Sequence, residues 1–447
     1  MTVSPTAPPS KRLLFASYHC LLDTASGAAV SMRELLGALS QRRWQVSVLC
    51  GTSLDAAQGP SLEDMLAENW QPGSVRQVAS EVAPFELLSG SIGAVPALVY
   101  RPADTVVPPP LALGAPFVIL LEHLLDRLRP DVLVTYGGHW MGRAILACAK
   151  SRRIPVVFWL RNCSYQNAKF FADVQRLLVP SEATRRYYHQ KLGLSCTAIA
   201  SPINPEKILC SPGDQPCVTF INPQPAKGVF WFAGVTRELH RRRPDIPVLI
   251  VEGRGTTTWI SAAGLTPNQT NLRVLPATRD PREFYRQTRI LLTPSLWHET
   301  FARVAVEALF NGIPVLASTR GALPEVLGDA GFLFDIPPHY TEHTRLVPTS
   351  REVQPWVDTI IRLWDDQAFY QTHRQRCLAA SQAYLPGPLI DRHEKTILDA
   401  ISDSHSLTIP PRDHSDLSDL CKRLYDSAES RRLWAAIPSV LDQLVSS

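Results

Sequence analysis

Residues 290–317 read ILLTPSLWHETFARVAVEALFNGIPVLA. The first four residues form an apolar, strand-like run that ends at Thr293, and a second apolar run follows at Pro314–Ala317. Between these runs, apolar residues recur at helical spacing over Arg303–Asn311. An order of strand, helix and strand in which the strands are apolar throughout is typical of a parallel sheet covered by helices. This segment therefore predicts an α/β fold.

The same alternation extends through both halves of the chain. In the second half, further strands and helices are expected at Cys217–Ile221, Val229–Arg241, Val248–Val251, Leu272–Leu275 and Arg282–Gln287. In the first half, we expect strands at Arg12–Ala16, Gln45–Cys50, Asp131–Thr135, Pro155–Leu160 and Arg176–Val179, and helices at Ala28–Arg42, Trp140–Ser151 and Glu182–Leu192. The Pro-containing segment 201–205 interrupts the pattern. It predicts two doubly wound, Rossmann-like domains, residues 11–205 and 206–385, that face each other across a cleft.

Three segments fall outside this alternation. Residues 1–10 are rich in Pro, Ser and Thr, and we expect a disordered tail there. Between Gly51 and Pro110 the pattern gives way to Pro, Gly and Ser with one short helical candidate at Leu62–Trp70, so we expect an insertion that shapes a specificity surface rather than a core. Residues 386–447 follow a helical stretch over Arg351–Tyr384 and predict a C-terminal helical extension: a crossing helix, a polar linker over Ser402–Ser415 and a helical tail over Leu417–Leu444.

Composition limits the classes of function. Charged residues make up 19 % of the 447 residues, and the formal net charge of +4 is too low for a protein whose main partner is nucleic acid. The nine Cys lack zinc-type spacing and predict reduced thiols, and no Asp-x-Asp pair in a loop indicates a divalent-metal site. The N-terminus lacks the pattern of a secretory signal, and the longest apolar run, Ala112–Leu121, is shorter than the roughly 20 residues that span a membrane. We therefore expect a cytoplasmic protein that needs neither metal nor cofactor.

Arg and aromatic residues cluster at Arg185–Lys191 and Arg237–Arg243. Solvated helix faces are the default interpretation of such clusters. The alternative is a surface for anionic lipid head groups, which would place the protein peripherally at the inner face of a membrane.

Two carboxylates flank the start of the helix expected at Arg303. Glu299 lies just before the helix, and Glu307 lies one to two turns inside it. Their separation corresponds to roughly 12 Å at a rise of about 1.5 Å per residue, which is about the span from a sugar ring across a diphosphate to a ribose. The free amides at a helix N-terminus bind anions. The pattern favours a ligand with hydroxyl groups at both ends and phosphate between them, over direct two-carboxylate glycoside hydrolysis.

This stretch, His298-Glu-Thr-Phe-Ala-Arg-Val-Ala-Val-Glu307, resembles the signature of the retaining family-4 glycosyltransferases of the GT-B fold. Three further segments are similar to that family in order and spacing: Phe220–Gly228, Val248–Gly255, and Gly312–Glu325 with Ala330–Phe334. The resemblance is strong over residues 215–335 and moderate near Leu13–Gly27 and Val179–Thr184. It implies a donor-binding C-terminal domain and an acceptor-binding N-terminal domain.

The resemblance implies a role for each matching residue of the motif. Glu299 would bind the sugar hydroxyls, the backbone amides of Arg303 and Val304 would bind the distal phosphate, and Glu307 would hold the nucleotide ribose. Phe301 lies in the same donor-binding turn. For the two carboxylates, a helix-capping acid and a surface helix residue are the alternatives.

Two glycine- or lysine-bearing loops complete the donor site that the resemblance implies. Lys227, the only lysine between Lys207 and Lys395, would neutralise the donor diphosphate. Gly27, in the small-residue loop after the first strand, would let the backbone approach phosphate and acceptor. A solvated helix-end charge and a simple turn are the alternatives for these two positions.

The chain departs from the family's pattern on the donor side. Asn222 stands where the family usually has an Arg, so half of the cationic clamp on the diphosphate is missing unless Arg254 or another Arg replaces it. Ala302 replaces the second Gly of the usual Glu-Gly-Phe-Gly, which the backbone tolerates if φ is negative there. We place all three residues in the candidate donor site.

On the acceptor side, Arg161 or Asn162 takes the place of a His that many members carry near the reacting carbon. His139 follows the strand expected to end at Thr135 and is a candidate for contact with an acceptor hydroxyl, with helix capping as the alternative. With Glu299 and Lys227 it forms the candidate catalytic set. We expect His298, beside Glu299, to be a packing residue.

These observations predict an enzyme that moves a hexosyl group from a nucleoside-diphosphate sugar to a hydroxyl acceptor. The resemblance implies metal-independent displacement on one face of the sugar, with retention of configuration, and UDP in preference to GDP. A lipid-linked saccharide, a polysaccharide and a small metabolite are the acceptor classes left open. The alternative functions are a nucleotide-sugar epimerase or hydrolase on the same fold and a non-catalytic nucleotide-sugar-binding or scaffold protein.

Overall fold

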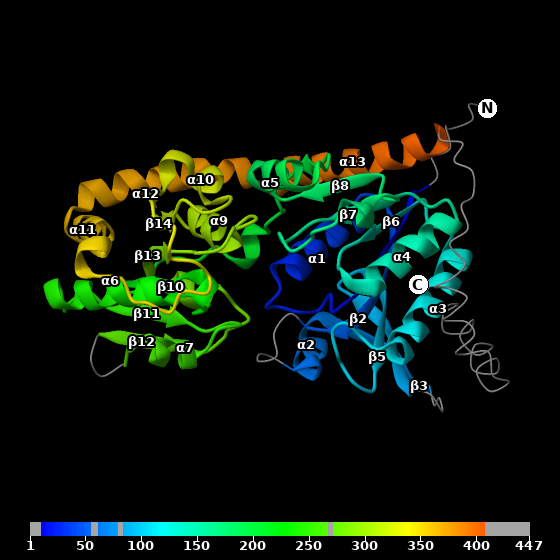
Figure 1. Cartoon of the computed structure of the whole chain (residues 1–447), viewed down its shortest axis with the longest axis horizontal. Helices are drawn as coiled ribbons and strands as arrows, with labels where there is room; N and C mark the ends of the chain where they lie inside the picture. The colour runs from blue at the N-terminus through cyan, green and yellow to red at the C-terminus, as the bar shows by residue number, and fades with distance from the viewer. Residues whose placement is uncertain (1–9, 55–60, 79–83, 267–270, 407–447) are drawn as a thin grey trace, which may run out of the picture.

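The computed structural model describes residues 10–54, 61–78, 84–266 and 271–406, and these residues form two α/β domains (Figure 1). The sheet of the N-terminal half has the strand order β3-β4-β5-β2-β1-β6-β7-β8-β9, and the sheet of the C-terminal half has the order β12-β11-β10-β13-β14-β15. Both central strands, β1 and β10, pair in parallel with both neighbours. The prediction of two doubly wound domains is confirmed.

The N-terminal domain buries apolar side chains on both faces of its sheet. Its strands are β1 (Arg12–His19), β2 (Gln45–Ser53), β3 (Trp70–Val78), β4 (Phe85–Ile92), β5 (Val95–Pro102), β6 (Val132–Thr135), β7 (Val156–Trp159), β8 (Arg176–Val179) and β9 (Thr197–Ala198). Its helices are α1 (Gly27–Ser40), α2 (Leu62–Asn69), α3 (Leu111–Leu128), α4 (His139–Ser151) and α5 (Glu182–Leu192). Along β1, Leu14 and Ala16 belong to one buried cluster and Leu13 and Phe15 to another, as the two-residue period of a strand requires.

The C-terminal domain is built in the same way on six short parallel strands. These are β10 (Cys217–Ile221), β11 (Val248–Val251), β12 (Leu272–Leu275), β13 (Thr288–Thr293), β14 (Val315–Ser318) and β15 (Phe332–Phe334). Its helices are α6 (Val229–Arg242), α7 (Thr257–Ala262), α8 (Arg282–Tyr285), α9 (Arg303–Phe310) and α10 (Leu323–Leu327). The unit of β13, α9 and β14 lies within two residues of the bounds expected from residues 290–317.

The segment Gly51–Pro110 is the main correction to the sequence-based fold. We expected a surface insertion, but β4 and β5 extend the N-terminal sheet and bury Leu87, Leu98 and Tyr100 in its core. β5 pairs in parallel with β2, and β4 pairs antiparallel with β5. The short helix at Leu62 is confirmed as α2. Local Pro and Gly made the segment read as turns, whereas pairing with β2 decides its structure.

The C-terminal extension crosses from one domain to the other. α11 (Ser350–Asp365) and α12 (Gln367–Ser381) belong to the C-terminal side, and α13 (Pro386–Ser406) runs back along the N-terminal domain (Figure 1). Leu389, Ile397 and Ala400 of α13 are buried in the same apolar cluster as α1. Because α13 continues to Ser406, the expected linker cannot begin at Ser402. The rest of that linker and the expected helix over Leu417–Leu444 lie outside the described residues.

Two further expectations concern membranes and cysteines. Within the described ranges, no helix is long and apolar enough to cross a membrane. The eight cysteines described there carry no disulfide, which agrees with reduced thiols; Cys421 lies outside these ranges.

Candidate functional site

Loops at the carboxyl ends of both sheets meet at the domain interface. Arg254, after β11, donates from Nε and Nη2 to the carbonyl oxygen of Ala25, after β1, at 3.1 and 3.0 Å. The Thr300 hydroxyl, after β13, donates to the carbonyl of Arg161, after β7, at 3.0 Å. In doubly wound folds, ligands bind at the carboxyl ends of strands. The candidate site residues are therefore brought to the edge where this fold binds ligands.

The two candidate residues Lys227 and Glu299 contact each other directly. Lys227 Nζ lies 2.6 Å from Glu299 Oε1, and the Ser295 hydroxyl donates to the same oxygen at 2.5 Å. Lys227 Nζ also lies 4.8 Å from the ring centre of the partly exposed Trp297. Burial acts to raise the pKa of Glu299, but the charge of Lys227 and hydrogen bonds from Lys227, Ser295 and Trp297 outweigh burial and hold the pKa below its ordinary value. The carboxylate is therefore ionised at neutral pH.

Two glycines allow the backbone to bring this pair together. Gly228, directly after Lys227, has φ of +85°, and a Cβ there would lie 2.0 Å from the carbonyl oxygen of Pro294. Gly321 has φ of +61°, and a Cβ there would lie 2.2 Å from the carbonyl oxygen of Glu299. Any side chain at either position would force these loops apart. The loop after β10, the loop after β13 and the turn after β14 are thus packed backbone to backbone around Glu299.

The N-terminus of α9 differs from our expectation at Ala302. We required a negative φ there, but Ala302 has φ of +59° and ψ of 63° and precedes the helix in a left-handed conformation. An alanine in this region costs about 1–2 kcal/mol. Ala302 also provides no side-chain cap, so the first amides of α9, those of Arg303 and Val304, carry no capping side chain. This arrangement suits an anion at the helix N-terminus.

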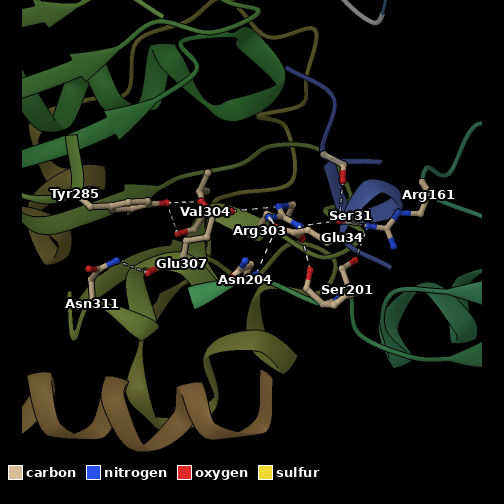
Figure 2. A network of polar contacts seen from close by, with 12 residues as sticks. Ser31, Glu34, Arg161, Ser201, Asn204, Tyr285, Arg303, Val304, Glu307 and Asn311 are labelled. Atoms are coloured by element: carbon tan, nitrogen blue, oxygen red, sulfur yellow. Dashed lines mark hydrogen bonds and ion pairs between the residues drawn. The ribbon is translucent and has the colours of Figure 1, made fainter. Parts of the chain in front are cut away.

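Glu307 lies at the far end of the motif and is oriented by two side chains. Tyr285 Oη donates to Glu307 Oε2 at 2.8 Å, and Arg303 Nε donates to Glu307 Oε1 at 3.2 Å (Figure 2). The Glu307 side chain is 10 % exposed. Burial, together with the charge of Glu307 and its hydrogen bond, raises the pKa of Tyr285 well above its ordinary range, so the phenol remains a donor. The carboxylate is held in one orientation and retains acceptor capacity for hydroxyl groups.

Asn222 holds the loop after β11, and Arg254 joins that loop to the N-terminal domain. Asn222 has φ of +62°, a conformation that Asn tolerates better than most residues, and its Oδ1 accepts from the amide of Gly255 at 2.8 Å. This gives a structural reason for Asn at a position where we expected a missing cation. Arg254 reaches across to Ala25 rather than lying in an exposed turn.

Three further residues of the sequence-based prediction, Gly27, Phe301 and His298, lie near the N-terminus of α9 or near Glu299. Gly27 begins α1, and a Cβ there would lie 3.5 Å from Arg303 Cδ, so this loop does approach the α9 N-terminus. The Phe301 side chain is buried, with its ring 6.0 Å from that of Tyr384, so only its backbone remains for a donor contact. His298 packs its ring 5.0 Å from that of Tyr187, which agrees with a packing role.

His139 belongs to a separate pocket of the N-terminal domain. It is exposed, begins α4 with φ of +63°, and lines a cavity of only about 10 Å³ with Tyr18, His19 and Tyr136 at the ends of β1 and β6. The structure does not bring it into contact with Lys227 or Glu299. Its proposed contact with an acceptor stays a prediction.

Sequence reasoning missed three groups that hold the candidate residues. Ser295 binds Glu299, Tyr285 binds Glu307, and Glu34 of α1 binds Arg303 at 3.0 Å. Ser295 lies four residues before Glu299 in the turn after β13, so its position was a usable signal. Tyr285 lies in another helix and Glu34 in another domain, and no local pattern marks either.

No group of three or more His, Cys, Asp or Glu within the described ranges is arranged to hold a metal ion. Besides the guanidiniums of Arg254 and Arg303, which are hydrogen-bonded to the N-terminal domain, the site offers the positive groups of Lys227 and of the first amides of α9. These are the groups a phosphate-bearing ligand would meet.

Two Rossmann-like domains whose carboxyl ends meet around a Lys, a helix N-terminus and two carboxylates define the GT-B class of proteins. Residues 25–207 match the model of Glycosyltransferase Family 4, and residues 215–366 match the model of Glycosyl transferases group 1. The two matches fall on the two domains in order. The chain therefore belongs to the glycosyltransferases of the GT-B type, and the resemblance inferred from its sequence is confirmed.

Solved structures of low sequence identity share the fold. HepE from Anabaena in complex with UDP and glucose is 16 % identical, with coverage of 86 % of this chain and 99 % of HepE and a TM-score of 0.62. Sucrose-phosphate synthase from Thermosynechococcus elongatus is 14 % identical, with coverage of 88 % of this chain and 100 % of the synthase and a TM-score of 0.62.

A curated protein matches a shorter stretch of the sequence. Spore coat protein SA of Bacillus subtilis (strain 168) is 33 % identical over 79 residues, which are 17 % of this chain and 21 % of that protein. The match thus spans only about a fifth of this curated relative.

Proposed function

We propose that the protein transfers a hexosyl group from a nucleoside-diphosphate sugar to a hydroxyl acceptor, with retention of configuration and without a metal ion. The observation that carries the proposal is the Lys227–Glu299 pair, 2.6 Å apart and beside the uncapped N-terminus of α9, with Glu307 further along the same helix. This order of groups matches the order of sugar, diphosphate and ribose in the donor.

Donor binding would give both members of the pair new partners. The ammonium of Lys227 would turn to the diphosphate, and the Glu299 carboxylate would accept hydrogen bonds from sugar hydroxyls. The amides of Arg303 and Val304 would bind the distal phosphate, and Glu307 the ribose. Lys227 and the amides would then face the negative charge that develops on the leaving group, where fixed positive groups stabilise a transition state most. This is our reason for proposing transfer without a metal.

The proposed reaction proceeds on one face of the sugar. The acceptor oxygen forms a bond to the anomeric carbon while the bond from that carbon to the distal phosphate oxygen breaks. The acceptor's proton passes to that phosphate oxygen, and the products are the glycoside and the nucleoside diphosphate. No protein base is required, and Glu299 contributes by positioning the sugar ring.

UDP is the nucleotide we favour. HepE, which shares the fold at a TM-score of 0.62, was solved with UDP and glucose. The acceptor would approach from the N-terminal domain, where the exposed His139 begins α4 just after the end of β6.

The cluster at Arg237–Arg243 does not favour a membrane-bound acceptor. Arg241, Arg242 and Arg243 are each paired with a carboxylate, of Glu238, Asp358 and Asp365 respectively, so their charges are already balanced within the domain. The pairing of these three arginines favours a solvated helix face for this cluster, and a cytoplasmic location remains part of the proposal.

A transfer assay tests this function. The protein is incubated with a panel of UDP-, GDP- and dTDP-hexoses and candidate acceptors, with and without EDTA, and products are analysed by NMR. We expect a glycoside with the donor's anomeric configuration, and equal rates with EDTA. Inversion would refute the mechanism, free sugar or an epimer would indicate a hydrolase or epimerase, and binding without turnover would indicate a binding protein.

A further inference from the structure

The Arg303 side chain joins the two domains at the donor site. Its Nη1 donates to Ser31 Oγ at 2.8 Å and to Glu34 Oε2 at 3.0 Å, both on α1 of the N-terminal domain (Figure 2). The same nitrogen donates to the carbonyl of Pro202, in the segment between the domains, at 3.3 Å. Its Nε donates to Glu307 on α9. One guanidinium therefore contacts the candidate ribose carboxylate, the opposite domain and the connecting segment.

The Glu34–Arg303 ion pair is largely removed from solvent. The Arg303 side chain is 13 % exposed and that of Glu34 is 10 % exposed. Burial acts to lower the pKa of Arg303, but the charges of Glu34 and Glu307 outweigh burial and raise it. Removing one partner of a buried pair leaves an uncompensated charge, which is much more costly than loss of a surface pair. Glu34 is thus the carboxylate that balances Arg303 from the N-terminal side.

A second buried guanidinium, that of Arg161, is linked to Arg303 through the Ser31 hydroxyl. Arg161 Nη2 donates to Ser201 Oγ at 2.5 Å and to Ser31 Oγ at 3.4 Å, so Ser31 lies between the two cations. Burial and the charge of Arg303 lower the pKa of Arg161 to about 9. Among the described residues, no carboxylate forms an ion pair with Arg161. Glu34 is therefore the N-terminal carboxylate in contact with a network that carries two buried cations.

We propose that Glu34 is a positioning residue for the donor site. Through Arg303 it fixes the orientation of Glu307 and holds the domain arrangement in which the loop at Gly27 lies against α9. The inference rests on the proposed function, because it assigns Glu307 to the ribose of a nucleotide donor.

The contacts predict which kinetic constant depends on Glu34. Without the Glu34 charge, Arg303 keeps only Glu307 as a charged partner, and its guanidinium would compete with ribose hydroxyls for that carboxylate. Lys227 and Glu299 are held by Ser295 and by glycine contacts within their own domain, so they would stay in place. Donor affinity should fall while the chemical step changes little.

Glu34→Gln tests this proposal, with Glu122→Gln as the matched control. Glu122, on α3, is also buried in the N-terminal domain and pairs at 3.8 Å with Arg152, the residue that follows α4. We expect Glu34→Gln to raise the Kd for UDP, measured by calorimetry, and the KM for the donor at least tenfold, with kcat within threefold of wild type. Glu122→Gln should leave all three constants within threefold. Unchanged Kd and KM in Glu34→Gln would overturn the proposal, as would equal losses in the control.

A double-variant comparison separates positioning from general destabilisation. Because Glu34 acts through Arg303 on Glu307, adding Glu34→Gln to Glu307→Gln should change the Kd by less than threefold; independent, multiplying losses would contradict the proposal. If Glu34→Gln does not fold, Ser31→Ala removes the hydroxyl between the two guanidiniums and should raise the Kd at least fivefold. A Kd within threefold of wild type would then overturn the proposal. If the wild-type protein binds no nucleotide sugar, the proposed function fails too; if it binds and Glu34→Gln binds equally well, only this inference fails.

Discussion

The two carboxylates of the α9 motif are both buried, but they are held in different ways. Glu299 is bound by Lys227 and Ser295, which belong to its own domain. Glu307 is bound by Tyr285 and by Arg303, and Arg303 continues to Glu34 in the other domain. The end assigned to the sugar can therefore change partners without moving a domain. The end assigned to the ribose depends on how the domains are placed.

Removing the cation at the sugar end should have the largest effect. We expect Lys227→Ala to lower kcat by about 10²- to 10³-fold, because fixed positive groups facing a developing negative charge contribute about that much. The measurement is kcat at saturating donor, with Lys207→Ala, an exposed lysine outside the site, as control. A kcat within threefold of wild type in Lys227→Ala would show that the leaving group is stabilised elsewhere.

The pH dependence of stability should show the coupling of Lys227 to Glu299. In the wild type the pKa of Glu299 lies below its ordinary value, so its stabilising contribution is present above that value and is lost as the pH falls through the lowered pKa. In Lys227→Met, only the hydrogen bonds from Ser295 and Trp297 still act against burial, so the pKa of Glu299 should rise. The buried, unpaired carboxylate would then destabilise the variant at neutral pH and become protonated as the pH falls.

The stability difference between wild type and Lys227→Met should therefore shrink from pH 7 toward pH 4. Thermal unfolding measures it. The double variant Lys227→Met/Glu299→Gln serves as control, and its difference from Glu299→Gln alone should be independent of pH. A difference between wild type and Lys227→Met that stays constant with pH would contradict the coupling.

The smallest expected effect concerns the turn that joins the two ends. Ala302 has φ of +59°, so Ala302→Gly should relieve about 1–2 kcal/mol of strain against about 0.5–1 kcal/mol of added chain entropy in the unfolded state. A net gain of about 0.5–1 kcal/mol should appear in chemical unfolding. The same change at Ala305, inside α9, should destabilise the protein by about 1 kcal/mol or more. Destabilisation by Ala302→Gly would argue against the left-handed turn.

The sequence predicts the C-terminal domain better than the N-terminal one for a physical reason. In residues 290–317, apolar runs, helical spacing and the Gly312 turn all favour the same structure, so local preference and tertiary contact agree. In β3 and β4, Pro72, Gly73 and Gly90 favour turns locally. These preferences are overridden by the antiparallel pairing of β3, β4 and β5, which the parallel pairing of β5 with the distant strand β2 joins to the sheet. Helices and strands were predictable where the local sequence preference and the tertiary contacts favour the same structure.

In the candidate site too, the features with a local sequence signal were predictable, and those that depend on long-range contacts were not. The placement of Glu299 and Glu307 at the start of α9 was predictable from their spacing along the chain, and that of Lys227 in the loop after β10 was predictable from its resemblance to the family's loop. The roles of these three residues remain predictions. The left-handed φ of Ala302 was not, because it arises from close packing of loops from three strands. Glu34 lies 269 residues from Arg303, and only the domain interface brings the two together.

The central claim is that Glu299 contacts the sugar and Glu307 the ribose, and one calorimetric comparison tests it most directly. Wild type, Glu299→Ala and Glu307→Gln are each titrated with UDP and with the UDP-sugar that the wild type binds best. Glu299→Ala should bind UDP within threefold of wild type and lose the additional affinity that the sugar provides, whereas Glu307→Gln should lose at least tenfold for both ligands. If Glu299→Ala loses affinity for UDP itself, or if Glu307→Gln binds both ligands like wild type, the assignment of the two carboxylates is wrong.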